Sequence, residues 1–167
     1  MGSVSLEMMR LPFWAKVPLS ILAVEALGGL GAGVTSSQIP NWYALLNQPA
    51  LNPPNWIFGP VWICLYAMMG AAFALVWHRA KAGNAKRVAL SWFGAQLLLN
   101  LAWTPVFFAI HHLLAALVII VLLWGAIFMT IRHFRQLQPI TTPLLLPYLA
   151  WVSFATYLNA SYWWLNR

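Results

Sequence analysis

The stretch Asn52–Trp62 reads Asn-Pro-Pro-Asn-Trp-Ile-Phe-Gly-Pro-Val-Trp and separates an uncharged loop from a long apolar run. Two consecutive prolines cannot lie inside a helix, because each lacks an N–H and clashes with the preceding turn. Proline is favoured at a helix start, where its missing N–H would be unpaired in any case. We therefore expect a helix to begin directly after Pro54, with Trp56, Phe58 and Trp62 in its first turns.

The preceding loop, Pro40–Leu51, contains Trp42 and Tyr43 and no charged residue. An uncharged aromatic loop beside an aromatic helix start is typical of a lid over an apolar ligand. It is also typical of the aromatic belt that membrane proteins place at the membrane–water interface. The loop alone leaves both interpretations open.

The composition indicates a membrane protein. Of the 167 residues, 62% are hydrophobic and 7% are charged, whereas soluble domains have roughly 25% charged residues. Nine Lys and Arg against two Asp and Glu give a net charge of +7. Because these basic residues lie in short connectors between apolar runs, we expect contacts with the lipid bilayer and its anionic headgroups, and no nucleic-acid partner. The single cysteine, Cys64, excludes an intramolecular disulfide.

Five apolar runs are each close to the ~20 residues that span a bilayer. They are residues 17–39, 57–77, 88–110, 113–131 and 142–165. We predict an all-α integral membrane protein, a single domain over residues 1–167 folded as a five-transmembrane-helix bundle. The first run is longer than the core of a signal peptide and contains Glu25, which indicates a retained helix. Its retention, without a transit sequence, favours a bacterial membrane.

With five spans, almost all basic residues fall on one side of the membrane. That side has Arg10, Lys16, Arg79, Lys81, Lys86, Arg87, Arg132 and Arg135, and the other side has only Arg167. The positive-inside rule then places the N-terminus in the cytoplasm, and the aromatic loop and the C-terminus outside. In the first span, Gly29 and Gly33 form a small-xxx-small pair that predicts close helix packing, within one subunit or between two.

Three of the predicted helices combine aromatic and polar side chains on one face. The faces are Gln96, Asn100, Trp103 and Phe107; Trp62, Tyr66, Met69 and Phe73; and Tyr148, Trp151, Ala155 and Tyr162. Polar side chains in hydrocarbon are costly unless they point inward and find partners. Either the amides bond to neighbouring helices in a satisfied core, or the faces line a pocket for a flat, largely apolar ligand.

The residue types of ordinary catalysis are missing from the sequence. Glu7 and Glu25 are the only acids, so a pair of carboxylates for general acid–base chemistry is not available. The four histidines are scattered and form no cluster with metal-ligand spacing. We therefore expect no metal site and no required cofactor. Glu25 lies inside the first span, where an acid is either functional or protonated and bonded to a neighbour.

Three motifs follow one another along most of the chain. The first is Trp42-Tyr43, Pro49 and the Asn52–Trp62 stretch; the second is Gln96-Leu97, Asn100, Trp103, Pro105 and Phe107-Phe108; the third is Pro147–Trp151, Phe154–Thr156 and Leu158-Asn159. In these motifs the sequence closely resembles the TspO/MBR family, also called the tryptophan-rich sensory protein, translocator protein or peripheral benzodiazepine receptor family.

The resemblance implies a five-helix bundle, usually a homodimer, that binds porphyrins such as protoporphyrin IX and haem, sterols, and synthetic benzodiazepine-type ligands. It implies ligand contacts at Tyr43, Pro53, Trp62, Asn100, Trp103, Trp151 and Ala155. Leu51 and Gln48 depart from the Trp and Lys that are usual in the family, so lid contacts are expected to differ.

The sterol part of the resemblance has little support in the sequence. A loose cholesterol-binding pattern is matched in spacing by Leu158, Tyr162 and Arg167. Such patterns are weak evidence for sterol binding. The Tyr and Arg positions of the eukaryotic members fall near Ala160 and Trp164, which do not match.

Three functions are compatible with the resemblance. The protein binds tetrapyrroles in order to transport or sense them; or it is an enzyme of light-dependent oxidative protoporphyrin IX breakdown, with Trp62 and Trp151 as its catalytic residues; or it is a sterol-binding or partner-regulating membrane scaffold. No sequence feature separates the first function from the scaffold, whereas product analysis after illumination separates the second.

Overall fold

A computed structural model describes residues 11–167 of the chain. The described residues form six α-helices and two short 3-10 helices, and no strand. The elements are α1 (Phe13–Gly29), α2 (Ala32–Gln38), η1 (Tyr43–Leu45), η2 (Asn55–Ile57), α3 (Phe58–Arg79), α4 (Asn84–Phe108), α5 (Leu113–Leu137) and α6 (Thr141–Leu165). Glu7 and Arg10, which enter the expectations above, lie outside the described residues.

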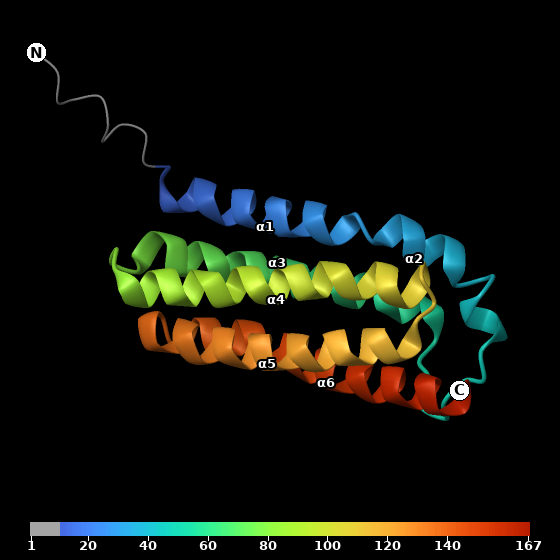
Figure 1. Ribbon diagram of the computed structural model, residues 1–167. Helices are drawn as coiled ribbons and strands as arrows, with labels where there is room; N and C mark the ends of the chain where they lie inside the picture. Colours follow the sequence, from blue (N-terminus) through green and yellow to red (C-terminus); the bar gives the residue numbers. More distant parts are fainter. Residues whose placement is uncertain (1–10) are drawn as a thin grey trace, which may run out of the picture.

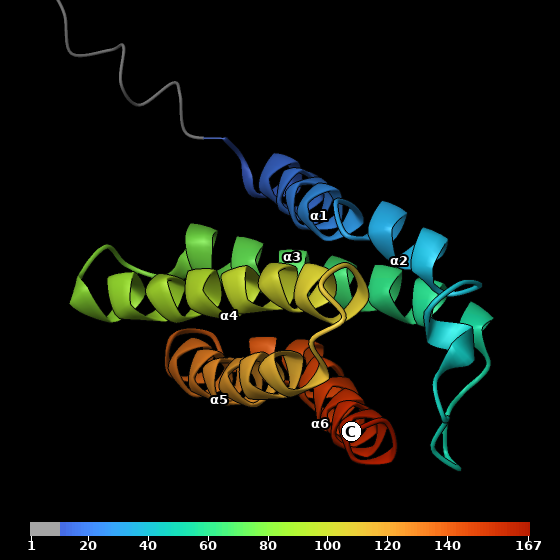
Figure 2. The ribbon, with the colours of Figure 1, turned by 45° about the vertical axis from the view of Figure 1, so that its right-hand side comes forward.

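The long helices run side by side, and each reverses the direction of the one before it (Figure 1). α1 packs on α3, α3 on α6, α6 on α5, and α5 on α4, while α2 contacts α4 (Figure 2). The α3–α4 and α5–α6 connections lie at the same end as the start of α1, and the aromatic loop and the C-terminus lie at the opposite end. The basic connectors therefore share one end of the bundle, as the alternation of the helices requires.

The single helix predicted over residues 17–39 is wrong, because the structure divides this stretch into α1 and α2. At the junction, the amides of Leu30 and Gly31 donate to the carbonyls of Leu27 and Gly28 at 3.2 Å. These are the tighter i→i+3 bonds of a 3-10 turn. Three glycines in four positions (28, 29 and 31) explain the break, since each glycine costs a helix about 1 kcal/mol relative to alanine.

The other predicted helices exist, with ends that differ from the expectations by a few residues. The expected helix after Pro54 is confirmed: η2 begins at Asn55 and α3 continues from Phe58. α5 runs to Leu137, beyond the predicted end at Ile131. This extension is polar and places Arg135 in the last turn, where a cation interacts favourably with the helix dipole.

Close helix contact is made by glycines other than the predicted pair. Among the described residues, a Cβ built on Gly29 or Gly33 meets no atom within 4 Å, so neither glycine permits a close helix approach there. A Cβ on Gly70 would lie 2.5 Å from the Cα of Ile21, and one on Gly28 would overlap the ring of Tyr66. Gly70 and Gly28 therefore allow the backbones of α1 and α3 to approach closely.

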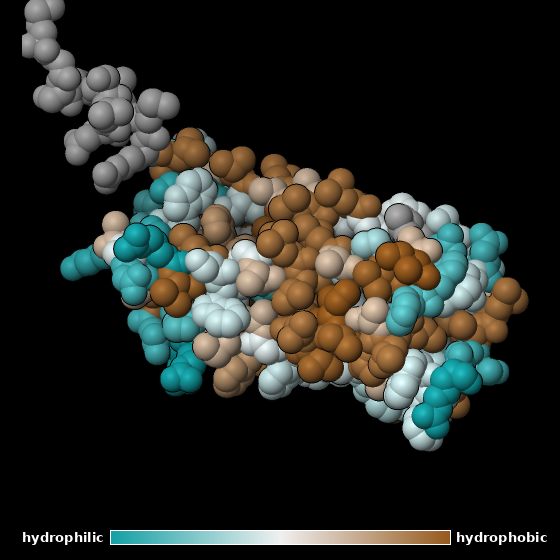
Figure 3. Space-filling model, in the orientation of Figure 1, coloured by the Kyte–Doolittle hydropathy of each residue, from teal (hydrophilic) through white to brown (hydrophobic). Residues whose placement is uncertain are grey.

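The surface is apolar around the middle of the bundle and hydrophilic toward its ends. Figure 3 shows this on one face, where a broad hydrophobic region lies between more polar ends. Large hydrophobic side chains exposed to the surroundings include Leu22, Ile63, Leu98, Val118, Val121 and Leu122. Exposed apolar area of this extent is what a lipid-facing surface requires.

Two helical stretches in the described part of the chain, Asn55–Arg79 and Leu113–Leu137, are long and apolar enough to cross a membrane by length and composition. The mean hydropathy of α4 is lowered by Gln96 and Asn100, which are 1% and 4% exposed. These polar side chains point into the bundle. Part of the polarity of α4 therefore lies in the interior of the bundle.

Candidate ligand cavity

The aromatic loop folds back onto the end of the bundle through Tyr43. Its side chain is 3% exposed, with its ring centroid 5.0 Å from that of Tyr162 and 5.8 Å from that of Phe108. The Tyr43 hydroxyl donates to Oδ1 of Asn52 at 2.9 Å. Burial raises the pKa of Tyr43 above its ordinary value, which keeps the hydroxyl protonated as a donor. The loop is thus folded inward, and its aromatic side chain enters the core.

A second set of contacts ties this loop to the C-terminus. The Asn47 amide N–H donates to Oδ1 of Asn166 at 2.9 Å, and Nδ2 of Asn166 donates back to the Asn47 carbonyl at 3.1 Å. On the other side, the Trp42 ring stacks on His111 with centroids 4.1 Å apart. His111 also lies 3.2 Å from Oε1 of Gln38 at the end of α2. The loop is therefore anchored on both sides of the helix bundle.

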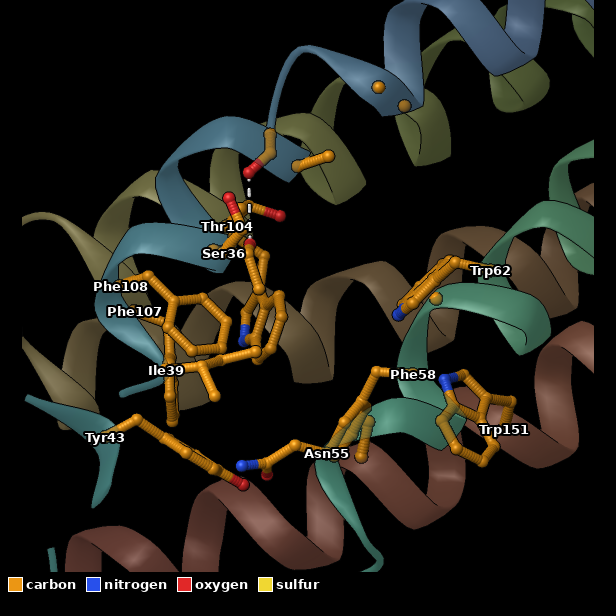
Figure 4. A pocket seen from close by; sticks show the side chains of 18 of the residues that line it. Ser36, Ile39, Tyr43, Asn55, Phe58, Trp62, Thr104, Phe107, Phe108 and Trp151 are labelled. Carbon is orange, nitrogen blue, oxygen red and sulfur yellow. Dashed lines mark hydrogen bonds between the residues drawn. The ribbon is translucent and has the colours of Figure 1, made fainter. Parts of the chain in front are cut away.

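Beneath the loop lies a cavity of about 380 Å³ between α1, α2, α3, α4 and α6 (Figure 4). Most of its surface is aromatic or aliphatic. The aromatic side chains that line it are Tyr43, Phe58, Trp62, Tyr66, Trp103, Phe107, Phe108, Trp151 and Tyr162. The polar side chains are Glu25, Thr35, Ser36, Asn55, Thr104 and Asn159. A concave apolar site with a few polar groups, of this volume, is typical of a small-molecule binding site.

Two of the three tryptophans that line the cavity have indole N–H groups without a hydrogen-bond partner among the described residues. These are Trp62 on α3 and Trp151 on α6, and Figure 4 shows both nitrogens on the side of the cavity. Trp103 differs, because its Nε1 donates to Oδ1 of Asn159 at 3.0 Å. Trp62 and Trp151 therefore offer both an aromatic face and a free donor to a ligand, whereas Trp103 offers only its ring.

Five of the seven ligand positions that the sequence analysis named line the cavity. They are Tyr43, Trp62, Trp103, Trp151 and Ala155. Pro53 and Asn100 are not in the lining. Pro53 instead belongs to the turn that leads into η2, and Asn100 lies deeper in the bundle.

Asn100 belongs to a chain of hydrogen bonds that joins α3, α4 and α6. It accepts from the Tyr66 hydroxyl at 2.8 Å and donates to the Tyr148 oxygen at 3.1 Å. Tyr148 in turn donates to Oε1 of Gln96 at 3.0 Å. The polar face of α4 is therefore part of a hydrogen-bonded core at Gln96 and Asn100, and it lines the cavity at Trp103 and Phe107.

Sequence reasoning missed the wall that α1 and α2 provide. This wall consists of small and weakly polar residues, including Gly28, Gly31, Ala32, Thr35 and Ser36. The glycine cluster was a signal for close packing, but it also breaks the helix. Because of the break, the side chains of residues 32–39 that face inward are not those that a continuous helix over residues 17–39 would place there.

The residues of the loose sterol pattern do not form one surface. Leu158 and Tyr162 are 5% and 1% exposed and line the cavity. The Arg167 guanidinium instead lies 3.3 Å from the centroid of the Trp164 ring at the end of the chain. A sterol held by all three residues at once is therefore not favoured by this arrangement.

Few titratable side chains lie in or near the cavity. Among the described residues no group of three or more His, Cys, Asp or Glu can hold a metal ion. The nearby histidines have structural roles: His111 stacks on Trp42, and His112 accepts from the Ala115 amide at the start of α5. The lining contains one carboxylate, Glu25, and no basic side chain.

These features define a helical membrane protein with an aromatic cavity inside its bundle. Residues 20–165 match the model of the TspO/MBR family, which covers most of the chain. The chain belongs to this family, as its three motifs predict.

Similar proteins come from bacteria, archaea and animals. A tryptophan-rich protein TspO of Chlorobaculum tepidum is 43% identical over 141 residues, which are 84% of this chain and 89% of that protein. A protein of the same name from Archaeoglobus fulgidus is 39% identical over 151 residues, 90% of this chain and 97% of the relative. The human translocator protein is 42% identical over 123 residues, 73% of each chain.

Proposed function

We propose that the protein is a five-span membrane receptor that binds a tetrapyrrole, such as protoporphyrin IX or haem, in order to transport or sense it. The observation that most supports this proposal is the aromatic cavity beneath the Tyr43 loop. Relatives named translocator protein and tryptophan-rich sensory protein support a role in transport or sensing. Homodimer formation is part of the proposal through the family resemblance.

The shape and chemistry of the walls support a flat ligand. Trp62 stacks on Tyr66 at 5.2 Å between centroids, and Trp151 meets Phe58 edge-on at 6.0 Å. On the opposite side, Trp103 stacks on Phe107 at 5.1 Å. Aromatic surfaces on two sides of one cavity provide contact area for a planar conjugated ring. The free indole donors supply hydrogen bonds to its polar substituents.

The proposed topology has the N-terminus inside and the aromatic loop and C-terminus outside. It requires α1 and α2 to cross together as one broken span. Cysteine labelling at Gly83 and Asn47, in a Cys64→Ser background, tests this. We expect reagent added from outside to reach Asn47 and not Gly83; labelling of Gly83 alone from outside would invert the topology.

The binding proposal is tested by filling the cavity. Ala155→Trp adds an indole to a position in the lining, and we expect it to lower protoporphyrin IX affinity by about tenfold or more. Trp124→Phe is the matched control, because Trp124 lies on α5 outside the cavity. Equal affinity in wild type, Ala155→Trp and Trp124→Phe would show that porphyrin binds elsewhere.

A second candidate function is light-dependent oxidation of protoporphyrin IX, which is favoured by the position of Trp62 and Trp151 in the cavity. The excited porphyrin would exchange an electron with a neighbouring indole, and dioxygen would be the oxidant that takes up the electrons which the porphyrin ring loses. Phe keeps an aromatic face and is much harder to oxidise. If Trp62→Phe and Trp151→Phe bind porphyrin normally but lose the light-dependent product, the reaction depends on the indoles. Equal porphyrin consumption in both variants and wild type would mean ordinary sensitisation.

A further inference from the structure

Among the residues that the structure describes, Glu25 is the only charged side chain in the cavity lining. It lies on α1, one helical turn before Gly28, so the two residues share a face of the helix. Gly28 is pressed against the ring of Tyr66 on α3. The Glu25 carboxyl group is therefore placed beside the aromatic wall that Tyr66 and Trp62 form.

No hydrogen bond or ion pair within residues 11–167 satisfies this carboxylate. The nearest hydroxyl on that wall is not available, because Tyr66 donates its only proton to Asn100. The basic residue nearest in sequence on α1 is Lys16, nine positions earlier and about 14 Å away along the helix axis. Lys16 itself lies over the Trp77 ring at 4.8 Å and beside His78. The acid thus has no counter-charge among the described residues, so its ionised form is costly at this depth, and a cationic group of a ligand would offset that cost.

A carboxylate beside aromatic rings is the arrangement that recognises a positively charged nitrogen. The carboxylate supplies charge, and the faces of Trp62 and Tyr66 attract a cation through their quadrupoles. The same carboxylate repels an anionic group, and no basic side chain in the lining offsets that repulsion. The cavity is therefore not neutral toward the charge of its ligand.

We propose that Glu25 sets a charge preference in the cavity: it favours ligands whose inserted part carries a cationic nitrogen and disfavours those that place a carboxylate beside α1. This inference rests on the proposed function and names the ligand class within it. A tetrapyrrole dicarboxylate binds with its propionates directed away from α1. Neutral and cationic derivatives of the same ring bind more tightly.

Three porphyrins with one ring and different charge test the proposal. They are protoporphyrin IX, its dimethyl ester, and its diamide with two terminal ammonium groups. Each is titrated into wild type and Glu25→Gln in the same detergent, so that partition of the ligand into micelles cancels in the ratio of affinities. Glu7→Gln is the control, because it removes the only other acid in the chain. Gln matches Glu in size, and Glu25→Ala provides a second neutral variant.

For wild type and Glu7→Gln we expect the diamide to bind most tightly and the diacid most weakly, with about tenfold or more between them. In Glu25→Gln and Glu25→Ala we expect this ratio to fall to near one. The inference is overturned if the ratio is the same with and without Glu25 while Ala155→Trp weakens all three ligands. If Ala155→Trp weakens none of them, the proposed cavity site itself is wrong.

Discussion

The two walls of the cavity are built in opposite ways. The wall from α3, α4 and α6 is aromatic. Deeper in the bundle, a chain of hydrogen bonds runs from Tyr66 through Asn100 and Tyr148 to Gln96 and joins these three helices. The wall from α1 and α2 is small and broken, with Gly28, Gly31 and an acid that has no partner among the described residues. The first wall supplies contact area and rigidity. The second supplies space and, through Glu25, charge.

This difference separates residues that hold the cavity together from residues that select what enters it. Substitutions in the hydrogen-bond chain are expected to act on stability, and substitutions in the lining to act on ligand affinity. Positions where α1 meets α3 are expected to act on both, because they set the distance between the walls.

The largest effect is expected from Gly70→Ala, which alters the contact between the walls. The added methyl group would lie 2.5 Å from the Cα of Ile21 and 2.9 Å from the Ser20 carbonyl oxygen. Because backbone atoms cannot turn aside, α1 must move, at a cost of about 1–3 kcal/mol. Thermal unfolding in detergent measures this loss, and porphyrin affinity falls with it.

Gly125→Ala is the matched control for Gly70→Ala. It makes the same change on α5, where the new methyl group meets no atom within 4 Å. Its unfolding temperature is expected to equal or exceed that of wild type, since alanine favours a helix. Equal stability of Gly70→Ala and Gly125→Ala would contradict the close backbone contact.

Asn100→Leu is expected to have the next largest effect, and on stability more than on binding. It removes two interhelical hydrogen bonds, each worth about 0.6 kcal/mol on average in membranes. Porphyrin affinity is expected to change less than threefold or so, because Asn100 does not line the cavity. A strong loss of affinity with unchanged stability would place Asn100 in the ligand site after all.

Much of this contrast was predictable from the sequence, but only for one wall. Helical spacing placed Gln96, Asn100, Trp103 and Phe107 on one inward face, and the aromatic motifs identified Tyr43, Trp62 and Trp151. Spacing could not show where along α4 the satisfied core ends and the cavity begins, because that boundary depends on Tyr66 and Tyr148 from other helices.

The α1–α2 wall was not predictable for a different reason. Hydropathy is high on both sides of the glycine cluster, so residues 17–39 read as one span. The glycine cluster weakens the helix at this point, but glycines also suit close helix packing, and the sequence did not show which of the two roles they take. At the junction a Cβ on Gly31 would lie 2.9 Å from Cγ2 of Thr104 on α4, and this contact joins residues far apart in the chain.

A smaller effect is expected where the loop meets the C-terminus. Asn166→Ala removes the two bonds that tie Asn166 to Asn47. Exposed hydrogen bonds contribute about 0.5–1.5 kcal/mol each, so we expect faster porphyrin release, by roughly threefold to tenfold, with little change in unfolding temperature. Stopped-flow dissociation measures the rate. An unchanged rate would show that the loop does not limit ligand exit.

The smallest effect is expected at the basic end of the bundle. Lys81, Lys86 and Arg87 lie far from the loop end, in and after the α3–α4 connection. Burial and the nearby Lys16 lower the pKa of Lys86, and its Nζ is held by the carbonyls of Trp77 and Ala80. Changing all three residues to Gln is expected to leave protoporphyrin IX affinity nearly intact. A tenfold loss would mean that the ligand enters from this end.

We propose above that a flat ligand occupies the cavity between the aromatic wall and the α1–α2 wall. An experimental structure with protoporphyrin IX bound tests it most directly. We expect ring density within contact distance of Trp62, Trp151 and Phe107, under the Tyr43 loop. Density in the outer groove between Pro49, Tyr157 and Trp164, with the cavity empty, would contradict it.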